Sequence, residues 1–388
     1  MFALFSRRRG WRTISLLSTI CVFVVVAAYK LILVPAVEEE LQPVVVYSEN
    51  LPTPLVPVWE KPGSHHVYLA NGCFLFITRT MSLTKVRRTM FDIQKRFNDR
   101  YGYPYVFLSE QPLSELFQES ARYMAGPNVS VEFGLIQEED WGYPEWIVPE
   151  RAEQAAMDWA EANDMAADRA GYRHMLRYWA GPFASHPLMQ KYRFMWRLEP
   201  GSHYTCDFEY DPFLYLESRR LSYGFSISFT EMPDAVPSLA SAAREFVSEN
   251  AEIFEETASS SNSLGWLFDM EYNRCQFLTN SEIVDLDFIR SKKYLRLFGH
   301  LDRKGGMYYE RWSDATVRSL AVAMFLNSTQ VAWLDDIGYK HDLLNNCPTS
   351  VERQMRCACD PAKSSHRLPM SCSARWSTSA RSINPNDI

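Results

Sequence analysis

Short apolar runs alternate along the chain with amphipathic stretches, starting near residue 72. Residues 73–79 have the length and composition of a buried strand, and residues 103–109 and 129–136 those of a second and a third strand. The stretches between them repeat apolar residues at helical spacing, namely Val86, Met90, Ile93 and Phe97, then Leu113, Leu116, Phe117 and Ala121. This alternation predicts a parallel sheet with right-handed crossovers. Ligands bind such sheets at the carboxyl ends of the strands, where Arg79 and Ser109 stand.

The second half of the chain continues with the same two kinds of segment. The pattern predicts strands at 192–198, 223–229 and 330–334, and helices at 150–167, 237–254 and 315–326. We therefore expect one mixed α/β domain, in which the second half completes the sheet begun by the first. The first of these strands runs into Glu199 and the last leads toward His341, so an acid and a histidine are delivered to one edge.

The N-terminal part has a different pattern. Four arginines precede the mostly apolar segment 13–29, which has 17 residues, and a second apolar stretch follows Lys30, whose long side chain can reach the membrane surface. The basic flank predicts a cytosolic N-terminus. The expected layout is a cytosolic tail 1–12, a transmembrane signal anchor 13–34, a proline-rich stem 35–64, a lumenal domain 65–376 and a C-terminal tail 377–388. A cleaved signal peptide is the alternative, but no clear small-x-small cleavage site follows.

Charge and missing motifs narrow the classes of function. The formal net charge is −7, and no basic stripe offsets it, so we expect no nucleic-acid partner. The sequence has no Gly-x-Gly-x-x-Gly, no P-loop and no His-Glu-x-x-His. Dinucleotide binding, P-loop phosphoryl transfer and zinc hydrolysis are therefore not expected.

Eight cysteines suggest an oxidised domain. Cys21 lies in the N-terminal apolar segment, and Cys73 lies in the first predicted strand, where a free thiol packs as a small hydrophobe. The other six form an even set, from which we predict three disulfides of open pairing, several of them tying the C-terminal tail to the body. These six are Cys206, Cys275, Cys347, Cys357, Cys359 and Cys372.

Carboxylates and a histidine supply the candidate chemistry. Glu199 is followed by Pro200, which fixes how the chain leaves the strand. Divalent Mn²⁺ accepts both carboxylate and imidazole ligands, so Glu199 with His341 suits a metal that neutralises a nucleotide diphosphate. The alternative for each acid is a helix cap or a solvated charge, and Asp314 in particular is well placed to cap the helix that follows. Glu282 has no evident partner nearby in the sequence.

Several motifs resemble those of one family. They are GYRHM at 171–175, WRLEP at 196–200, CDFEYDPFLYLE at 206–217, YGFSISF at 223–229, NSEIVDLDFIR at 280–290, GGMYYERWSDA at 305–315, DDIGYKHD at 335–342, and the tail motifs CACDP and SCSARW. In order and spacing, residues 66–376 are similar to the fungal Golgi α-1,2-mannosyltransferases of glycosyltransferase family 15.

The resemblance implies a GT-A-like fold, that is, a Rossmann-like nucleotide-sugar-binding mixed sheet flanked by helices. It also implies GDP-mannose as donor, Mn²⁺ as cofactor, retention of the anomeric configuration, and a type II single-pass protein of the Golgi membrane with its catalytic domain in the lumen. The expected acceptor is a mannose-terminated N- or O-linked glycan, and a glycolipid acceptor stays open. An inactive homologue that binds GDP-mannose or a partner enzyme, and a mannan-binding module, are the alternatives.

The resemblance also assigns roles to residues. Glu199 matches the Glu-Pro acid and His341 the histidine that ligates the metal, while Glu282 matches the candidate nucleophile. Tyr172 matches a tyrosine near the reacting centre and Asp314 an acid of the acceptor region. Arg79, at the first strand end, is expected beside the donor. The sequence departs from the family pattern at Leu176, Trp179, Gly201, Leu278 and Ser281.

Overall fold

The computed structural model describes residues 68–163, 170–255, 264–267 and 271–381. The chain divides into two units, Met1–Leu55 and Val56–Ile388. The first unit, with the expected transmembrane anchor, lies outside the described residues, as does the expected stem. Among the helices that are described, none is long and apolar enough to span a bilayer.

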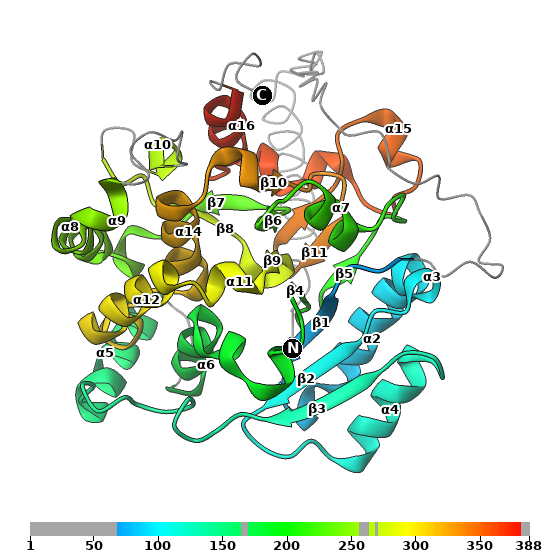
Figure 1. Ribbon diagram of the computed structural model, residues 1–388, viewed down its shortest axis with the longest axis horizontal. Helices are drawn as coiled ribbons and strands as arrows, with labels where there is room; N and C mark the ends of the chain where they lie inside the picture. Colours follow the sequence, from blue (N-terminus) through cyan, green and yellow to red (C-terminus); the bar gives the residue numbers. More distant parts are fainter. Residues whose placement is uncertain (1–67, 164–169, 256–263, 268–270, 382–388) are drawn as a thin grey trace, which may run out of the picture. The chain divides into compact units, whose positions relative to one another are not determined.

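A seven-stranded mixed sheet forms the centre of the second unit (Figure 1). Its strand order is β10-β6-β9-β4-β1-β2-β3. Most neighbours are parallel, but β9 runs antiparallel to both β4 and β6. The strands are β1 Gly72–Ile77, β2 Tyr105–Ser109, β3 Val131–Leu135, β4 Phe194–Arg197, β6 Tyr223–Phe225, β9 Ile283–Asp285 and β10 Val331–Trp333. The second half therefore completes the sheet begun by the first, as predicted.

Both faces of this sheet are covered, because successive side chains of a strand point to opposite sides. In β1, Phe74 and Phe76 enter one core, and Cys73 and Leu75 enter the other. All six residues of β1 are buried, as expected for a strand covered on two faces.

The helices lie mostly where the helical spacing predicted them. Those of the first core are α2 Leu83–Ile93, α4 Glu115–Ala125 and α7 Pro212–Ser218, and the short α3 Asp99–Tyr101 follows α2. On the other side are α5 Pro149–Ala162, α6 Ala170–Ala180, α8 Leu239–Glu249, α9 Ala251–Glu255, α10 Leu264–Leu267, α11 Leu286–Ile289, α12 Lys292–Lys304, α13 Gly306–Tyr309, α14 Asp314–Phe325 and α16 Ser373–Arg381. α15, Val351–Gln354, belongs to the C-terminal segment.

Two small sheets accompany the large one. One has the order β12-β11-β5, with β5 His203–Tyr204, β11 Tyr339–His341 and β12 Leu344–Asn346. The other pairs β7 Ser228–Thr230 with β8 Cys275–Phe277. The single strand predicted at 223–229 is therefore wrong: it breaks after Phe225 and its two halves join different sheets.

The three predicted disulfides are present, and two of them tie the C-terminal segment to the body while the third closes a short loop within that segment. They are Cys206–Cys357, Cys275–Cys372 and Cys347–Cys359. Cys73 is a free thiol, fully buried in β1, also as predicted. Burial raises the pKa of Cys73 well above its usual value, so this thiol stays protonated and unreactive.

Candidate active site

Glu199 leaves the carboxyl end of β4 through a tight turn. Proline at position 200 cannot donate a backbone hydrogen bond, so the strand stops there. The hydroxyl group of Thr89 on α2 fastens the turn, because it lies 3.0 Å from the Glu199 carbonyl oxygen and accepts the backbone N–H of Gly201 at 3.0 Å. Gly201 has φ 93°, a conformation that glycine adopts freely and that asparagine and aspartate tolerate better than most residues. The departure from the family pattern at Gly201 therefore leaves the turn possible.

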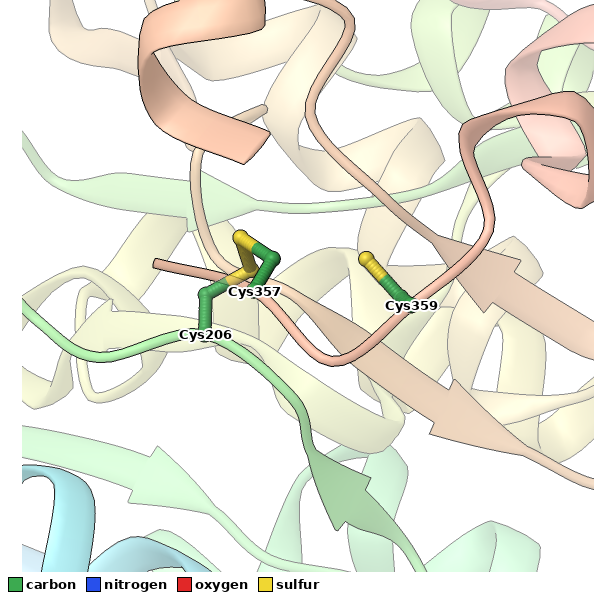
Figure 2. A group of neighbouring side chains, drawn as sticks. All are labelled: Cys206, Cys357 and Cys359. Carbon is green, nitrogen blue, oxygen red and sulfur yellow. A yellow bond between two sulfur atoms is a disulfide. The ribbon is translucent and has the colours of Figure 1, made fainter. Parts of the chain in front are cut away.

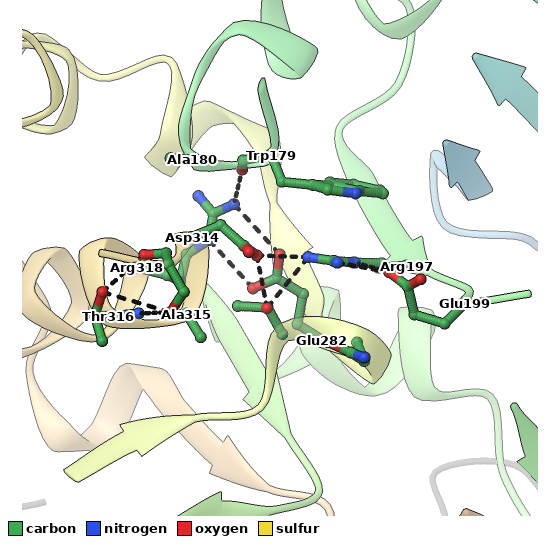
Figure 3. A network of polar contacts seen from close by, with 12 residues as sticks. Trp179, Ala180, Arg197, Glu199, Glu282, Asp314, Ala315, Thr316 and Arg318 are labelled. Carbon is green, nitrogen blue, oxygen red and sulfur yellow. Dashed lines mark hydrogen bonds and ion pairs between the residues drawn. The ribbon is translucent and has the colours of Figure 1, made fainter. Parts of the chain in front are cut away.

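Arg197 is the centre of a buried polar network beside Glu199 (Figure 3). Its guanidinium group donates to Glu199 Oε1 at 2.6 Å and to Asp314 Oδ2 at 2.5 Å. Thr279 joins the network, since its hydroxyl donates to the same Asp314 oxygen at 2.7 Å. The guanidinium carbon lies 4.0 Å from the ring centroid of Trp179, which adds a cation–π contact.

Glu282 faces a second buried guanidinium group, that of Arg318 on α14 (Figure 3). Arg318 Nε donates to Glu282 Oε2 at 3.2 Å, and Nη2 donates to Oε1 at 3.3 Å. Both side chains are fully buried. Arg318 also donates to the Tyr294 hydroxyl at 2.5 Å and to the Trp179 carbonyl oxygen at 3.0 Å. The partner that the sequence did not reveal near Glu282 therefore comes from a helix 36 residues further along the chain.

Three carboxylates and two guanidinium groups thus share one buried cluster, formed by Arg197, Glu199, Glu282, Asp314 and Arg318. Burial raises the pKa of Glu282, although Arg318 and Arg197 partly oppose this. Burial alone would lower the pKa of Arg197, but Glu199 and Asp314 raise it above its usual value. The arginines therefore stay charged and hold the carboxylates in place.

Asp314 does not cap α14, so that interpretation of the sequence is wrong. Ser313 is the N-cap, and its hydroxyl accepts the backbone N–H of Thr316 at 3.2 Å. Asp314 is the first residue of the helix, and its carboxylate instead reaches Arg197 and Thr279. The negative charge at a helix N-terminus is still favourable.

His341 is linked to the Arg197 network through the 3₁₀ turn Thr279–Ser281. Its Nδ1 lies 3.2 Å from Asn280 Nδ2, and Asn280 directly follows Thr279. His341 ends β11, which pairs with β5, and β5 follows the turn that starts at Glu199. The structure therefore brings the segments of Glu199 and His341 together from two directions, as the sequence predicted for that edge.

Tyr172 and Arg79 lie on neighbouring segments at the same edge. Arg79, just after β1, is half exposed and forms an ion pair with Glu110, just after β2. A side chain at Gly171 would have its Cβ 3.1 Å from Arg79 Nη2, which places α6 beside the end of β1. Tyr172, the next residue, accepts a hydrogen bond at its hydroxyl from Arg311 Nη2 at 3.2 Å. These contacts bring the start of α6 next to the carboxyl ends of β1 and β2.

Other groups of metal-binding residue types are less suited to hold an ion. Cys206, Cys357 and Cys359 lie close together, but each sulfur is already in a disulfide, and only a thiolate binds metal (Figure 2). Glu245, Glu249 and His300 form a second group on α8 and α12, where Glu245 is paired with Lys304. This second group is mostly exposed, which is common for acidic residues without an ion.

Sequence reasoning missed the two arginines that organise the site. Arg197 stands inside the WRLEP motif and Arg318 inside an apolar helix, where a lone charge among apolar residues is a signal for a buried partner. A lone charge of this kind predicts that a buried partner exists, but it does not predict which residue is the partner. Asp314, the partner of Arg197, is 117 residues away in the sequence.

Comparison with known proteins identifies the family. The family model described as glycolipid 2-alpha-mannosyltransferase matches residues 52–381. The chain is 34% identical to alpha-1,2 mannosyltransferase KTR1 of Saccharomyces cerevisiae over 311 residues, covering 79% of this chain and 78% of that protein. It is 33% identical to O-glycoside alpha-1,2-mannosyltransferase omh1 of Schizosaccharomyces pombe over 311 residues, again covering 79% of this chain and 78% of that protein.

Two solved structures are similar over most of the chain. Mannosyltransferase Ktr4p from S. cerevisiae in complex with GDP has a TM-score of 0.74 at 32% identity, covering 80% of this chain and 82% of that one. Core-mannan synthase A from Aspergillus fumigatus, in a Mn/GDP form, has a TM-score of 0.76 at 31% identity, covering 85% and 91%. The chain therefore belongs to the glycolipid 2-alpha-mannosyltransferase family, as its motifs predicted.

Proposed function

We propose that this protein is a retaining α-1,2-mannosyltransferase, which moves mannose from GDP-mannose to a mannose-terminated glycan in protein glycosylation. The observation that carries the proposal is the convergence of two segments at the carboxyl edge of the sheet: β5, which follows the turn at Glu199, pairs with β11, which ends at His341. Nucleotide ligands bind open α/β sheets at this edge.

The donor set at this edge suits a divalent cation. A carboxylate and an imidazole together fit Mn²⁺ better than Mg²⁺ or Ca²⁺, which prefer oxygen ligands alone. Glu199 and His341 are both partly accessible, with side chains 13% and 23% exposed, so a ligand can reach them. We propose that these two side chains hold Mn²⁺, which would neutralise the charge that develops on GDP as it leaves. The Mn/GDP form of core-mannan synthase A supports this choice of ion.

The other candidate residues have distinct proposed roles. Arg79, at the sheet edge, is proposed to contact the donor, and Tyr172, whose hydroxyl accepts a hydrogen bond from Arg311, is proposed to lie near the reacting centre. Glu282 is proposed as the nucleophile that attacks the far face of the sugar, which requires Arg318, bound to both carboxylate oxygens in this structure, to release one of them. Asp314, held by Arg197, is proposed as the acid of the acceptor region.

The proposed cellular setting follows from the sequence. We propose a type II protein of the Golgi membrane, with the cytosolic tail 1–12, the anchor 13–34, the stem 35–64 and a lumenal GT-A-like glycosyltransferase domain 65–376. The three disulfides support a lumenal location, because disulfides persist in oxidising compartments.

Binding of the donor to the purified full-length protein tests the metal site. We expect GDP-mannose to bind in the presence of Mn²⁺, and its affinity to fall at least tenfold in EDTA, in Glu199→Gln and in His341→Ala, because the diphosphate loses its counter-charge. Asp99→Asn, which removes a surface charge on α3, is the control and should bind as the wild type does. Calorimetry measures the affinities, and equal values with Mn²⁺ and with EDTA would contradict the metal role.

A transfer assay with a panel of mannosides tests the activity itself. Formation of an α-1,2-linked product with retained configuration, identified by NMR, is the expected result. Tight GDP-mannose binding with no transfer to any mannoside would instead favour an inactive homologue that binds the donor.

A further inference from the structure

Gly338 lies at the junction of the two segments that carry the proposed metal ligands. β5 follows the turn that begins at Glu199, and β11, which begins just after Gly338, ends at His341. The two strands pair antiparallel, and the backbone N–H of Thr205 donates to the Gly338 carbonyl oxygen at 2.8 Å. The separation of Glu199 from His341 therefore depends on how closely β11 approaches β5.

That approach leaves no room for a side chain at position 338. A Cβ there would lie 2.3 Å from Cys206 Sγ, 2.5 Å from Thr205 Oγ1 and 3.0 Å from the Cys206 backbone nitrogen. The sulfur cannot rotate away, because it is bonded to Cys357. The φ of Gly338 is outside the left-handed region, so the close contact, and not the backbone conformation, is what requires glycine.

The other side of this segment is fixed as well. Ala358 donates its backbone N–H to the Thr205 carbonyl oxygen at 2.7 Å, and Asp207 donates to the Arg356 carbonyl oxygen at 3.0 Å. The C-terminal segment therefore lies along residues 205–207 on one side while Gly338 lies against them on the other. Residues 205–207 therefore cannot move to make room for a side chain at position 338 without also displacing the segment around Cys357, which is bonded to Cys206.

We propose that Gly338 is a positioning residue that works with the Cys206–Cys357 disulfide to set the spacing of Glu199 and His341 for a divalent cation. We call this contact the 338–206 clamp. The inference rests on the proposed function, since it concerns the same metal site. A side chain at position 338 would move β11 away from β5, and His341 with it, while the sheet and the network at Arg197 stay in place.

Affinity for Mn²⁺ is the measurement that tests the clamp. Mn²⁺ is titrated into the full-length protein saturated with GDP, and Gly338→Ala is expected to bind it at least tenfold more weakly than the wild type. Gly299→Ala is the matched control, because a Cβ at this position of α12 would only meet Arg303 Nη1 at 3.5 Å, an ordinary contact. It should bind Mn²⁺ as the wild type does. Faster amide exchange at Thr205 in Gly338→Ala, seen without any metal, is the second expected result.

A double-mutant cycle separates the clamp from a general loss of stability. In the background Cys206→Ala/Cys357→Ala the nearest of the three close contacts is gone and the segment is no longer crosslinked, so adding Gly338→Ala should weaken Mn²⁺ binding by less than it does in the wild type. If Gly338→Ala does not fold alone, recovery of folding and Mn²⁺ binding in this background supports the clamp. Wild-type Mn²⁺ affinity in Gly338→Ala, or an equal loss in both backgrounds, overturns it. Absence of Mn²⁺ binding by the wild type overturns the proposed function instead.

Discussion

At the scale of single residues, Glu282 has a proposed catalytic role and a structural role, and a single substitution at Glu282 removes both. As the proposed nucleophile it would react with the sugar, and as the counter-charge of Arg318 it neutralises a buried cation. Glu282→Gln removes both, and leaving a buried cation unpaired costs about 3–5 kcal/mol of stability. A loss of activity in this variant alone would therefore say little about the chemistry.

The double variant Glu282→Gln/Arg318→Gln separates the two roles. It removes the whole charge pair, so we expect it to recover most of the stability lost in Glu282→Gln. If Glu282 is the nucleophile, kcat should stay at least about a thousandfold below the wild type in both variants, roughly 4 kcal/mol of barrier. Thermal unfolding and single-turnover kinetics measure the two effects.

The buried pair Arg177–Asp302, which the candidate active site does not include, is the matched control. Asp302→Asn should lose stability while the folded fraction keeps its kcat. Recovery of kcat along with stability in Glu282→Gln/Arg318→Gln would reject the nucleophile and leave Glu282 as a structural counter-charge.

At the scale of elements, the start of α7 depends on a carboxylate that titrates abnormally. Asp211 is the N-cap, and it accepts the backbone N–H groups of Phe213 and Leu214 and the Tyr103 hydroxyl. Burial nevertheless raises the pKa of Asp211 to about 6, against those hydrogen bonds. Since the folded state binds this proton more tightly than the unfolded state, the contribution of Asp211 to stability is greatest below about pH 4 and is lost as the pH rises through about 6.

Asp211→Asn should remove this pH dependence. The stability of the variant relative to the wild type is expected to rise by about 2–3 kcal/mol between pH 4 and pH 6.5, because only the wild type must ionise a buried group. Urea unfolding at a series of pH values measures the difference. Ser114→Ala, which removes the N-cap of α4 without a titrating group, should show a difference that does not change with pH. A constant difference for Asp211→Asn would refute the prediction.

The sequence predicted those elements whose pattern is local. β1, β2 and β3 follow from short apolar runs, and α2 and α4 from helical spacing, because each of these helices buries one apolar face. The insertion of β9 antiparallel between β4 and β6 was not foreseen, since three residues carry too little periodicity to fix a direction. The cap of α14 was misplaced by one residue because serine and aspartate at 313 and 314 are equally suited to the position.

Of the candidate site, the sequence predicted the residues at the strand ends but not the contacts between residues far apart in the chain. The strand ends and the family motifs pointed to Glu199 and His341, which the fold brings to one edge. The contacts of Arg197 and Arg318 were not predictable, because each joins residues that are far apart in the sequence and meet only in the folded chain. Tertiary packing, and not the local sequence pattern, determines which residues form such pairs.

At the scale of the whole molecule, the disulfides close loops of very different length. Cys275–Cys372 spans 97 residues, and Cys347–Cys359 spans 12. In the chain-entropy description, a longer loop restricts the unfolded chain more, by about 4.7 kcal/mol for the first pair and about 3 kcal/mol for the second. Cys275→Ala/Cys372→Ala should therefore lower the free energy of unfolding by about 2 kcal/mol more than Cys347→Ala/Cys359→Ala.

Denaturant unfolding of the two double variants, both with the remaining disulfides intact, measures this difference. Cys73→Ala serves as the control for loss of a sulfur without loss of a crosslink. Equal losses for the two pairs would mean that the native contacts of the crosslinks, and not the length of the loops, determine their effect.

The pairing of Cys206 and Cys275 with the end of the chain also fixes an order of events during synthesis. Their partners, Cys357 and Cys372, lie 151 and 97 residues later. At about 5–20 residues per second, a ribosome takes roughly 8–30 s to add the residues between Cys206 and Cys357. Cys206 has no native partner for that time, and Cys275 has none until Cys372 is added, while Cys73 is removed from competition once β1 is buried in the sheet. A chain that stops short of residue 357 would carry both thiols unpaired, a state that quality control can detect.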